Sequence, residues 1–88
     1  MAESGVSLSG WKNTSNQRLS KTFQFADFQT ALDFVNRVGA LAEEQQHHPD
    51  IHLAWGQVDV ETWTHDAGSV SSKDLILAEG VDRLFFSR

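Results

Sequence analysis

Residues 43–58 read EEQQHHPDIHLAWGQV, and this stretch decides the fold. It places two adjacent histidines directly before Pro49, the only proline in the chain. A proline disfavours helical geometry in the residue before it, so a helix that reaches this point ends by His48. Beyond the proline, large apolar residues alternate with smaller or polar ones on both sides of Gly56, which is typical of two strands joined by a tight turn.

These two strands are expected to pair as a hairpin. A two-residue loop that begins with Gly56 suits a type II′ turn and places Trp55 opposite Val58. Continuing this register outward brings His48 opposite His65, where cross-strand Cβ atoms are about 4.5–5.5 Å apart. The sequence therefore predicts that two histidines far apart in the chain meet at the open end of the hairpin.

The segments before this hairpin are a strand and a helix. Residues 19–25 alternate, which predicts a strand with one buried face. Asp27 then stands at a helix N-cap position, and the helix is expected to run toward Gln46 or His48. Its apolar stripe is drawn by residues spaced three and four apart, namely Phe28, Ala31, Leu32, Val35, Val38, Leu41 and Ala42.

After the hairpin, Ser71-x-x-Asp74 resembles a capping box at the start of a second amphipathic helix. With one more strand from Trp11 onward, the order is strand, strand, helix, strand, strand, helix. This order predicts an α+β fold in which helices cover an antiparallel sheet. Residues 1–10, rich in Ser and Gly, are expected to form a flexible N-terminal arm, and residues 11–88 a single domain.

Length, charge and cysteine content exclude several classes. A chain of 88 residues buries only about 60–65% of its unfolded surface, which favours a homo-oligomer. The net charge is −5 without a lysine or arginine cluster, so neither nucleic acid nor an anionic membrane is an expected partner. There is no cysteine, hence no disulfide, thiolate metal site or cysteine nucleophile. The N-terminus does not resemble a signal peptide or a membrane span, so we expect a cytoplasmic protein.

Titratable side chains are predicted to gather at the open end of the hairpin. Glu43 lies four residues before His47 and can reach it along the helix. His48 and His65 meet through the hairpin register, and the short loop of residues 66–70 starts Asp74 near the same place. Three imidazoles and two carboxylates then converge.

Each of these residues also has a purely structural explanation. Histidines at a helix C-terminus complement the helix dipole, Asp74 can be only a capping residue, and Glu43 can belong to a solvated helix end. His52 lies on the polar side of its strand, and we assign it no role. These explanations account for the residues singly and leave their predicted convergence as coincidence.

Metal binding, nucleophilic catalysis and acid–base catalysis are the three kinds of chemistry open to such a cluster. Imidazole and carboxylate suit zinc or iron, but Pro49 breaks the helix that an i, i+4 pair of His48 and His52 needs, and no established ligand motif is present. No serine stands in a recognisable nucleophile motif. Imidazoles without either partner favour general acid–base catalysis near neutral pH.

The spacing of these residues resembles that of the pterin-4a-carbinolamine dehydratase family. The matching residues are Glu43-x-x-x-His47-His48-Pro49, an aromatic at Trp55, His65 after nine intervening residues and Asp74 after eight more. Upstream, the similarity extends through Trp11, the run FQFADF at residues 23–28, and Leu41-Ala42-Glu43.

The resemblance implies a four-stranded antiparallel sheet with helices packed on one face, assembled into a homodimer or homotetramer. It implies a lyase that eliminates water from 4a-hydroxytetrahydropterin to give quinonoid dihydropterin, in the recycling or biosynthesis of tetrahydrobiopterin, with neither metal nor cofactor. By the resemblance, His47, His48, His65 and Asp74 are catalytic. The resemblance also implies that Glu43, His48, Pro49 and Trp55 bind the substrate.

The resemblance divides those roles further. His47 and His65 are the candidates for proton transfer, His48 orients the pterin, and Glu43 and Asp74 orient the imidazoles. The alternative is a protein-binding, assembly or coactivator module on the same scaffold, because some relatives have such roles. The poorly apolar N-terminus also departs from animal members, which carry a fuller helix there.

Overall fold

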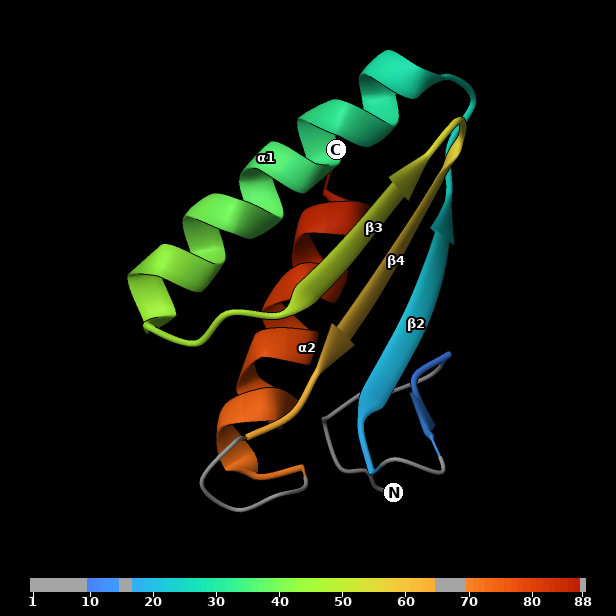
Figure 1. Ribbon diagram of the computed structural model, residues 1–88. Coiled ribbons are helices and arrows are strands. Elements are labelled where there is room, and N and C mark those ends of the chain that lie inside the picture. The colour runs from blue at the N-terminus through green and yellow to red at the C-terminus, as the bar shows by residue number, and fades with distance from the viewer. Residues whose placement is uncertain (1–9, 15–16, 65–69, 88) are drawn as a thin grey trace.

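The computed structural model describes residues 10–14, 17–64 and 70–87. Their secondary-structure elements alternate as the sequence predicts (Figure 1), and they are β1 (Lys12–Asn13), β2 (Leu19–Gln24), α1 (Phe28–Gln45), β3 (Asp50–Ala54), β4 (Gln57–Thr62) and α2 (Ser72–Phe86). Of the predicted N-terminal arm, only Gly10 lies among the described residues. Neither helix in these ranges has both the length and the hydropathy that crossing a bilayer requires.

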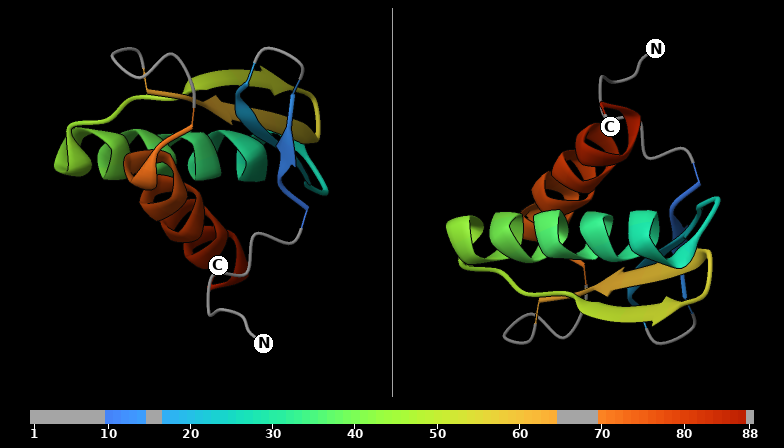
Figure 2. Two further views of the ribbon diagram at one scale, coloured as in Figure 1. Left: turned by 90° about the horizontal axis from the view of Figure 1, so that it is seen from below. Right: turned by 90° about the horizontal axis from the view of Figure 1, so that it is seen from above.

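The strands form one antiparallel sheet in the order β1-β2-β4-β3. Both helices lie on the same face of this sheet, and no helix or strand of the described residues covers the other, open face (Figure 2). Along β4, Val58, Val60 and Thr62 are fully buried under the helices, whereas the residues between them are half-buried on the open face. The predicted α+β fold, with a four-stranded antiparallel sheet and helices on one face, is confirmed.

Helix α1 begins and ends where the sequence predicts. The Asp27 carboxylate accepts a hydrogen bond from the Thr30 backbone N–H at 2.8 Å, which satisfies one of the free donors of the first turn. At the other end Gln46 adopts a left-handed conformation, with φ of 55°, and its N–H bonds back to the last turn. Pro49 follows three residues later, so the helix has both a stop and a cap.

The buried face of α1 is centred on a residue that the predicted stripe omitted. Phe34 is 2% exposed, whereas Phe28, the first residue of the helix, is 43% exposed. Phe34 lies in an aromatic cluster with Phe23, Phe25 and Phe85, whose ring centroids are 5.0–5.9 Å from that of Phe34 or one another. This cluster joins β2, α1 and α2, so the face of α1 is set by the aromatic residues across from it.

The predicted hairpin turn lies one residue too late in the chain, so each predicted cross-strand partner is wrong by two residues. Ala54 pairs with Gln57 and Leu53 with Val58, so Trp55 and Gly56 form the turn. Gly56 is the second central residue and has φ of 68°, as in a type II turn, rather than the first as in type II′. The cause is tertiary: the Gly56 carbonyl accepts a hydrogen bond from the Phe25 N–H at 2.8 Å, and a Cβ on Gly56 would come within 3.0 Å of the Phe25 carbonyl.

A buried polar network fastens the C-terminal half of α2 to the sheet. The Trp11 indole N–H donates to the Asp82 carboxylate at 3.1 Å, and the Lys21 ammonium, from the helix-covered side of β2, donates to it at 2.9 Å. Lys21 also lies 5.0 Å from the centre of the Phe23 ring. A lysine on the inner face of a strand is thus explained by an aspartate 61 positions away.

Candidate functional site

The first turn of α2 places one carboxylate inside the molecule. Ser71 caps the helix and Asp74 is the fourth member of the predicted capping box, accepting the Ser71 N–H at 2.9 Å. Asp74 is fully buried, although aspartate is normally exposed. Since a buried charge needs partners, the surroundings of this carboxylate decide what the site can do.

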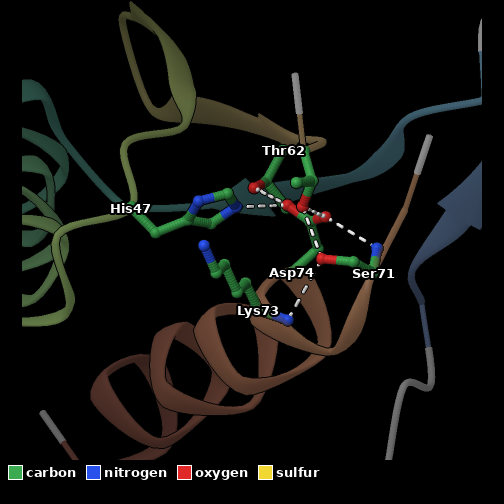
Figure 3. Close-up of polar contacts among 6 residues, drawn as sticks. His47, Thr62, Ser71, Lys73 and Asp74 are labelled. Carbon is green, nitrogen blue, oxygen red and sulfur yellow. Dashed lines mark hydrogen bonds and ion pairs between the residues drawn. The ribbon is translucent and has the colours of Figure 1, made fainter. Parts of the chain in front are cut away.

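Side chains from two other segments complete the shell of Asp74 (Figure 3). Thr62, at the end of β4, donates its hydroxyl to one carboxylate oxygen at 2.5 Å, and Thr64 donates to the other at 2.7 Å. Burial alone would raise the pKa of Asp74, but the hydrogen bonds from Thr62, His47, Thr64 and Ser71 outweigh it and lower the pKa below 3.8. Asp74 is therefore an anion at neutral pH.

His47 is the titratable partner of this anion. Its backbone N–H bonds to the Ala42 carbonyl at 3.1 Å, just beyond the left-handed Gln46, which turns the imidazole inward. The ring Nε2 lies 2.6 Å from Asp74 Oδ1, and the side chain is only 13% exposed. Because an ionised carboxylate only accepts hydrogen bonds, Nε2 carries the proton, and Nδ1 is the basic nitrogen of the neutral ring.

His48 points away from this pair. Its Nε2 lies 2.5 Å from Glu43 Oε2, and both side chains are largely exposed. The prediction that Glu43 reaches His47 is wrong, because the left-handed Gln46 ends the helical spacing on which it depended. The helix-end acid holds the second histidine instead of the first.

The structure brings other predicted residues together only in part. His65 lies outside the described residues, so its meeting with His48 stays a prediction, but the register behind it is wrong because the ladder begins at Asp50 opposite Glu61. Pro49 is half-buried in the connection to β3. Trp55 is 73% exposed in the hairpin turn, at the end of the molecule where α1 begins, whereas His47 follows the other end of α1 (Figure 1).

Thr62 and Thr64 are candidate site residues that the sequence pattern did not predict. Thr62 has the same parity as Val58 and Val60, so a hydroxyl at a buried strand position was the available signal of a polar partner. Among the residues that the structure describes, no three His, Asp or Glu side chains are grouped so that they could hold one metal ion.

Two hollows in the surface are candidate sites, and they differ in volume and in the chemistry of their lining. A hollow of about 530 Å³ lies on the open sheet face and is lined by polar residues that include Asp50, His52, Asp59 and Glu61. In it Asp59 already accepts from Thr22 at 2.6 Å, and Glu61 pairs with Arg18 at 2.9 Å. The hollow at His47 is smaller, about 200 Å³, but it is lined by the imidazole that pairs with the buried Asp74. Perturbed, partly buried pairs are the better marker of a reactive site.

Comparison of the chain with known proteins identifies the family to which it belongs. A family model described as pterin 4 alpha carbinolamine dehydratase matches residues 1–84. The chain belongs to this family. The expected resemblance is thereby confirmed.

Relatives in the pterin carbinolamine dehydratase family carry the matching name. A Rubrobacter xylanophilus protein named "Putative pterin-4-alpha-carbinolamine dehydratase" is 47% identical over 77 residues, 88% of this chain and 72% of that protein. A Syntrophotalea carbinolica protein of the same name is 53% identical over 68 residues, 77% of this chain and 61% of that protein. The expected enzyme class, a lyase, is thus the one for which these relatives are named, and the chain spans between 61% and 72% of their lengths.

Solved structures of similar proteins have the same fold. The crystal structure of a transcriptional coactivator/pterin dehydratase from Brucella melitensis superposes with a TM-score of 0.82 at 30% identity, covering 86% of this chain and 82% of that one. A pterin dehydratase-like protein identified as a RuBisCO assembly factor in the alpha-carboxysome gives 0.74 at 23% identity, covering 85% and 88%. The second likeness concerns the fold alone.

Proposed function

We propose that this protein eliminates water from a 4a-hydroxytetrahydropterin to give the quinonoid dihydropterin, by acid–base catalysis in which His47 transfers a proton. The observation that carries the proposal is the contact of 2.6 Å between His47 Nε2 and the buried anion Asp74, in a chain of this family. A histidine oriented by a carboxylate is a common arrangement for a general base or acid.

The reaction needs two proton transfers around a flat heterocycle. The bond between C4a and its hydroxyl oxygen breaks as that oxygen receives a proton and leaves as water, and N5 loses its proton as the ring forms a C=N bond. In the proposed mechanism His47 Nδ1 accepts a proton, and the resulting imidazolium is stabilised by Asp74. No net oxidation occurs, and the two transfers balance.

His65 is the proposed partner for the second transfer. The residue before it in the sequence, Thr64, donates to Asp74 Oδ2 at 2.7 Å and so lies next to the His47–Asp74 pair. His48, held by Glu43 on the exposed side, is proposed to orient the pterin. Pro49, half-buried directly after His48, is proposed to contribute to pterin binding. Trp55 lies in the hairpin turn, at the end of the molecule opposite His47, and cannot complete this site within one chain. Its proposed binding role therefore requires a second copy.

The proposed activity is tested by comparing the dehydration rates of three variants with that of wild type. His47→Ala and His65→Ala should each lower the dehydration rate about 10²–10⁴-fold, which is the usual effect of removing a positioned acid or base. His52→Ala is the matched control, because His52 pairs with Asp59 on the open sheet face and should leave the rate unchanged. Circular dichroism checks the fold of each variant.

The assay uses chemically generated 4a-hydroxytetrahydropterin, with and without a chelator. Activity that survives the chelator supports a mechanism without a metal. An inactive wild type, or a His47→Ala/His65→Ala double variant as fast as wild type, contradicts the proposed function.

A protein-binding or assembly role is the second candidate. Besides the name of the Brucella melitensis neighbour, its support is exposed apolar surface: Trp55 is 73% and Phe28 43% exposed, both at the end of the molecule away from His47. On this alternative, wild type lacks dehydratase activity, and partner binding is insensitive to His47→Ala but lost in Trp55→Ala.

A further inference from the structure

The hollow beside His47 contains side chains that the acid–base mechanism leaves without a role. It lies between the end of α1 and the first turns of α2, has a volume of about 200 Å³, and is lined by Gln45, His47, Lys73 and Ile76. A ligand site commonly combines an apolar wall with a few polar groups that fix orientation. Lys73 and Ile76 supply both, on the same helix face, because they are three positions apart.

Lys73 presents a cation at this hollow. Its backbone N–H donates to the Ser71 hydroxyl at 3.3 Å, and its side chain extends from α2 toward the His47 ring (Figure 3). In the described ranges of the chain, no carboxylate pairs with this ammonium, whereas Arg83 on the same helix pairs with Glu79 at 3.4 Å. Its sequence neighbour Asp74 is turned inward, with its oxygens engaged by four donors.

Ile76 gives the hollow an apolar side. It is 54% exposed, although nearly all other large aliphatic residues of the described sequence are buried or half-buried. An exposed isoleucine beside an imidazole and an ammonium can pack on the face of a flat ring and lose contact with water on doing so. Gln45, at the end of α1, adds an amide that both donates and accepts hydrogen bonds.

We propose that Lys73 and Ile76 form the binding half of the site. Lys73 donates a hydrogen bond to the carbonyl oxygen on the polar edge of the pterin, and Ile76 packs on the ring face, while His47 reaches the reacting atoms. This inference rests on the proposed function and adds two substrate-binding residues to it. Because the carbonyl is present before, during and after loss of water, Lys73 contributes to binding rather than to the rate of the chemical step.

The test measures binding and turnover separately. Binding is measured by calorimetry with a 7,8-dihydropterin, which lacks the C4a hydroxyl and cannot be dehydrated. The variants are Lys73→Met, which keeps length and removes charge, Lys73→Arg, which restores a donor cation, and Ile76→Ser. Arg83→Met is the matched control, because it removes one positive charge from α2 at a distance from the hollow.

Lys73→Met should weaken dihydropterin binding about 10- to 100-fold, as expected for loss of a hydrogen bond from a charged donor. Its KM should rise by a similar factor, with kcat changed less than about threefold. Lys73→Arg should recover most of the affinity, Ile76→Ser should weaken binding several-fold, and Arg83→Met should match wild type. Circular dichroism checks that each variant is folded.

The outcomes separate this inference from the proposed reaction. If wild type turns over and Lys73→Met binds and reacts normally, the inference is overturned and the dehydratase function stands. If wild type binds the dihydropterin without turning over substrate, and Lys73→Met loses binding, the binding site stands and the proposed function fails. A wild type that does not bind the dihydropterin, or a Lys73→Met effect on kcat alone, overturns the inference.

Discussion

Asp74 serves the fold and the site with one carboxylate. It completes the capping box of α2, ties the end of β4 to that helix through Thr62 and Thr64, and orients His47. The capping box could be predicted because its members are three positions apart in the sequence. The threonines could not be assigned to it, since their contact with Asp74 depends on how α2 docks against the sheet.

Replacing Asp74 with Asn tests this shared role. The amide keeps the shape but loses the charge that four donors stabilise, so the free energy of unfolding should fall by about 3 kcal/mol. The dehydration rate should fall at least about tenfold, because the His47 imidazolium loses its counter-ion. Urea unfolding and the turnover assay measure the two effects.

Asp33→Asn is the control for that change. Asp33 accepts from Gln29 at 2.9 Å on the exposed side of α1, so its replacement should alter the unfolding free energy by less than about 0.5 kcal/mol. Equal losses in the two variants would contradict a special role for the buried carboxylate.

Acid should remove the contribution of Asp74. Because its pKa is lower in the folded protein than the ordinary value of 3.8, the anion stabilises the fold fully above that value. The stability is lost as the pH falls through the lower, folded-state pKa. The difference in unfolding free energy between wild type and Asp74→Asn should thus be constant from about pH 7 to 5 and shrink below about pH 4. A difference that does not change down to about pH 2 would show that the charge is not its source.

The glycines of the two helices differ in how much space surrounds them for an added methyl group. A Cβ on Gly39, in α1, would meet no atom within 4 Å, whereas a Cβ on Gly80, in α2, would come within 2.8 Å of Leu41 Cδ2. The close approach at Gly80 is where α2 crosses α1. No sequence pattern reveals which of two helical glycines lies at a crossing.

Gly39→Ala should therefore raise the free energy of unfolding by about 0.5–1 kcal/mol, because alanine loses less backbone entropy in a helix and meets no obstacle. Gly80→Ala should gain less or lose stability, since Leu41 must move. Thermal unfolding of the two variants gives the comparison. A larger gain for Gly80→Ala would mean that the helices are not in close contact there.

The element order, the helix ends and the presence of the hairpin followed from local signals, but the register of the hairpin did not. Asp27, Pro49 and Ser71 mark their boundaries through hydrogen bonds or steric effects within a few residues, so the sequence located them. The turn at Gly56 is fixed by a hydrogen bond from Phe25, which comes from another strand. Because of that contact, the observed register differs from the predicted one, and the predicted pairing of His48 with His65 loses its basis.

Across the whole molecule, the largely buried Lys21–Asp82 pair joins the sheet to the far end of α2. Lys21→Met would leave the Asp82 carboxylate buried with only the Trp11 indole as a described partner. The free energy of unfolding should fall by about 3 kcal/mol, because breaking one side of a buried pair leaves an uncompensated charge. Lys12→Met, at an exposed position of β1, should change it by less than about 0.5 kcal/mol. Chemical unfolding at neutral pH decides between an ion pair that supports α2 and one that does not.

The sheet also predicts self-association. β3 is at the end of the sheet order, and within the described strands one side of its backbone has no partner. Together with the limited burial of a short chain, this favours a homodimer or homotetramer. Light scattering at micromolar concentration should give at least twice the mass of one chain, and a persistent monomer would contradict the expectation.

The double duty of Asp74 also bears on how this scaffold can change over evolutionary time. A descendant that abandoned the chemistry would still need the aspartate to begin α2 and to hold the end of β4, so substitutions there would remain costly. His47 contributes only one of the four hydrogen bonds to Asp74, so its replacement should cost the fold less, and selection on it would relax once the proposed reaction is abandoned. Among proteins of this fold, we therefore expect the aspartate to be retained wherever the scaffold is retained. We expect the histidine to be retained only where the proposed chemistry is retained as well.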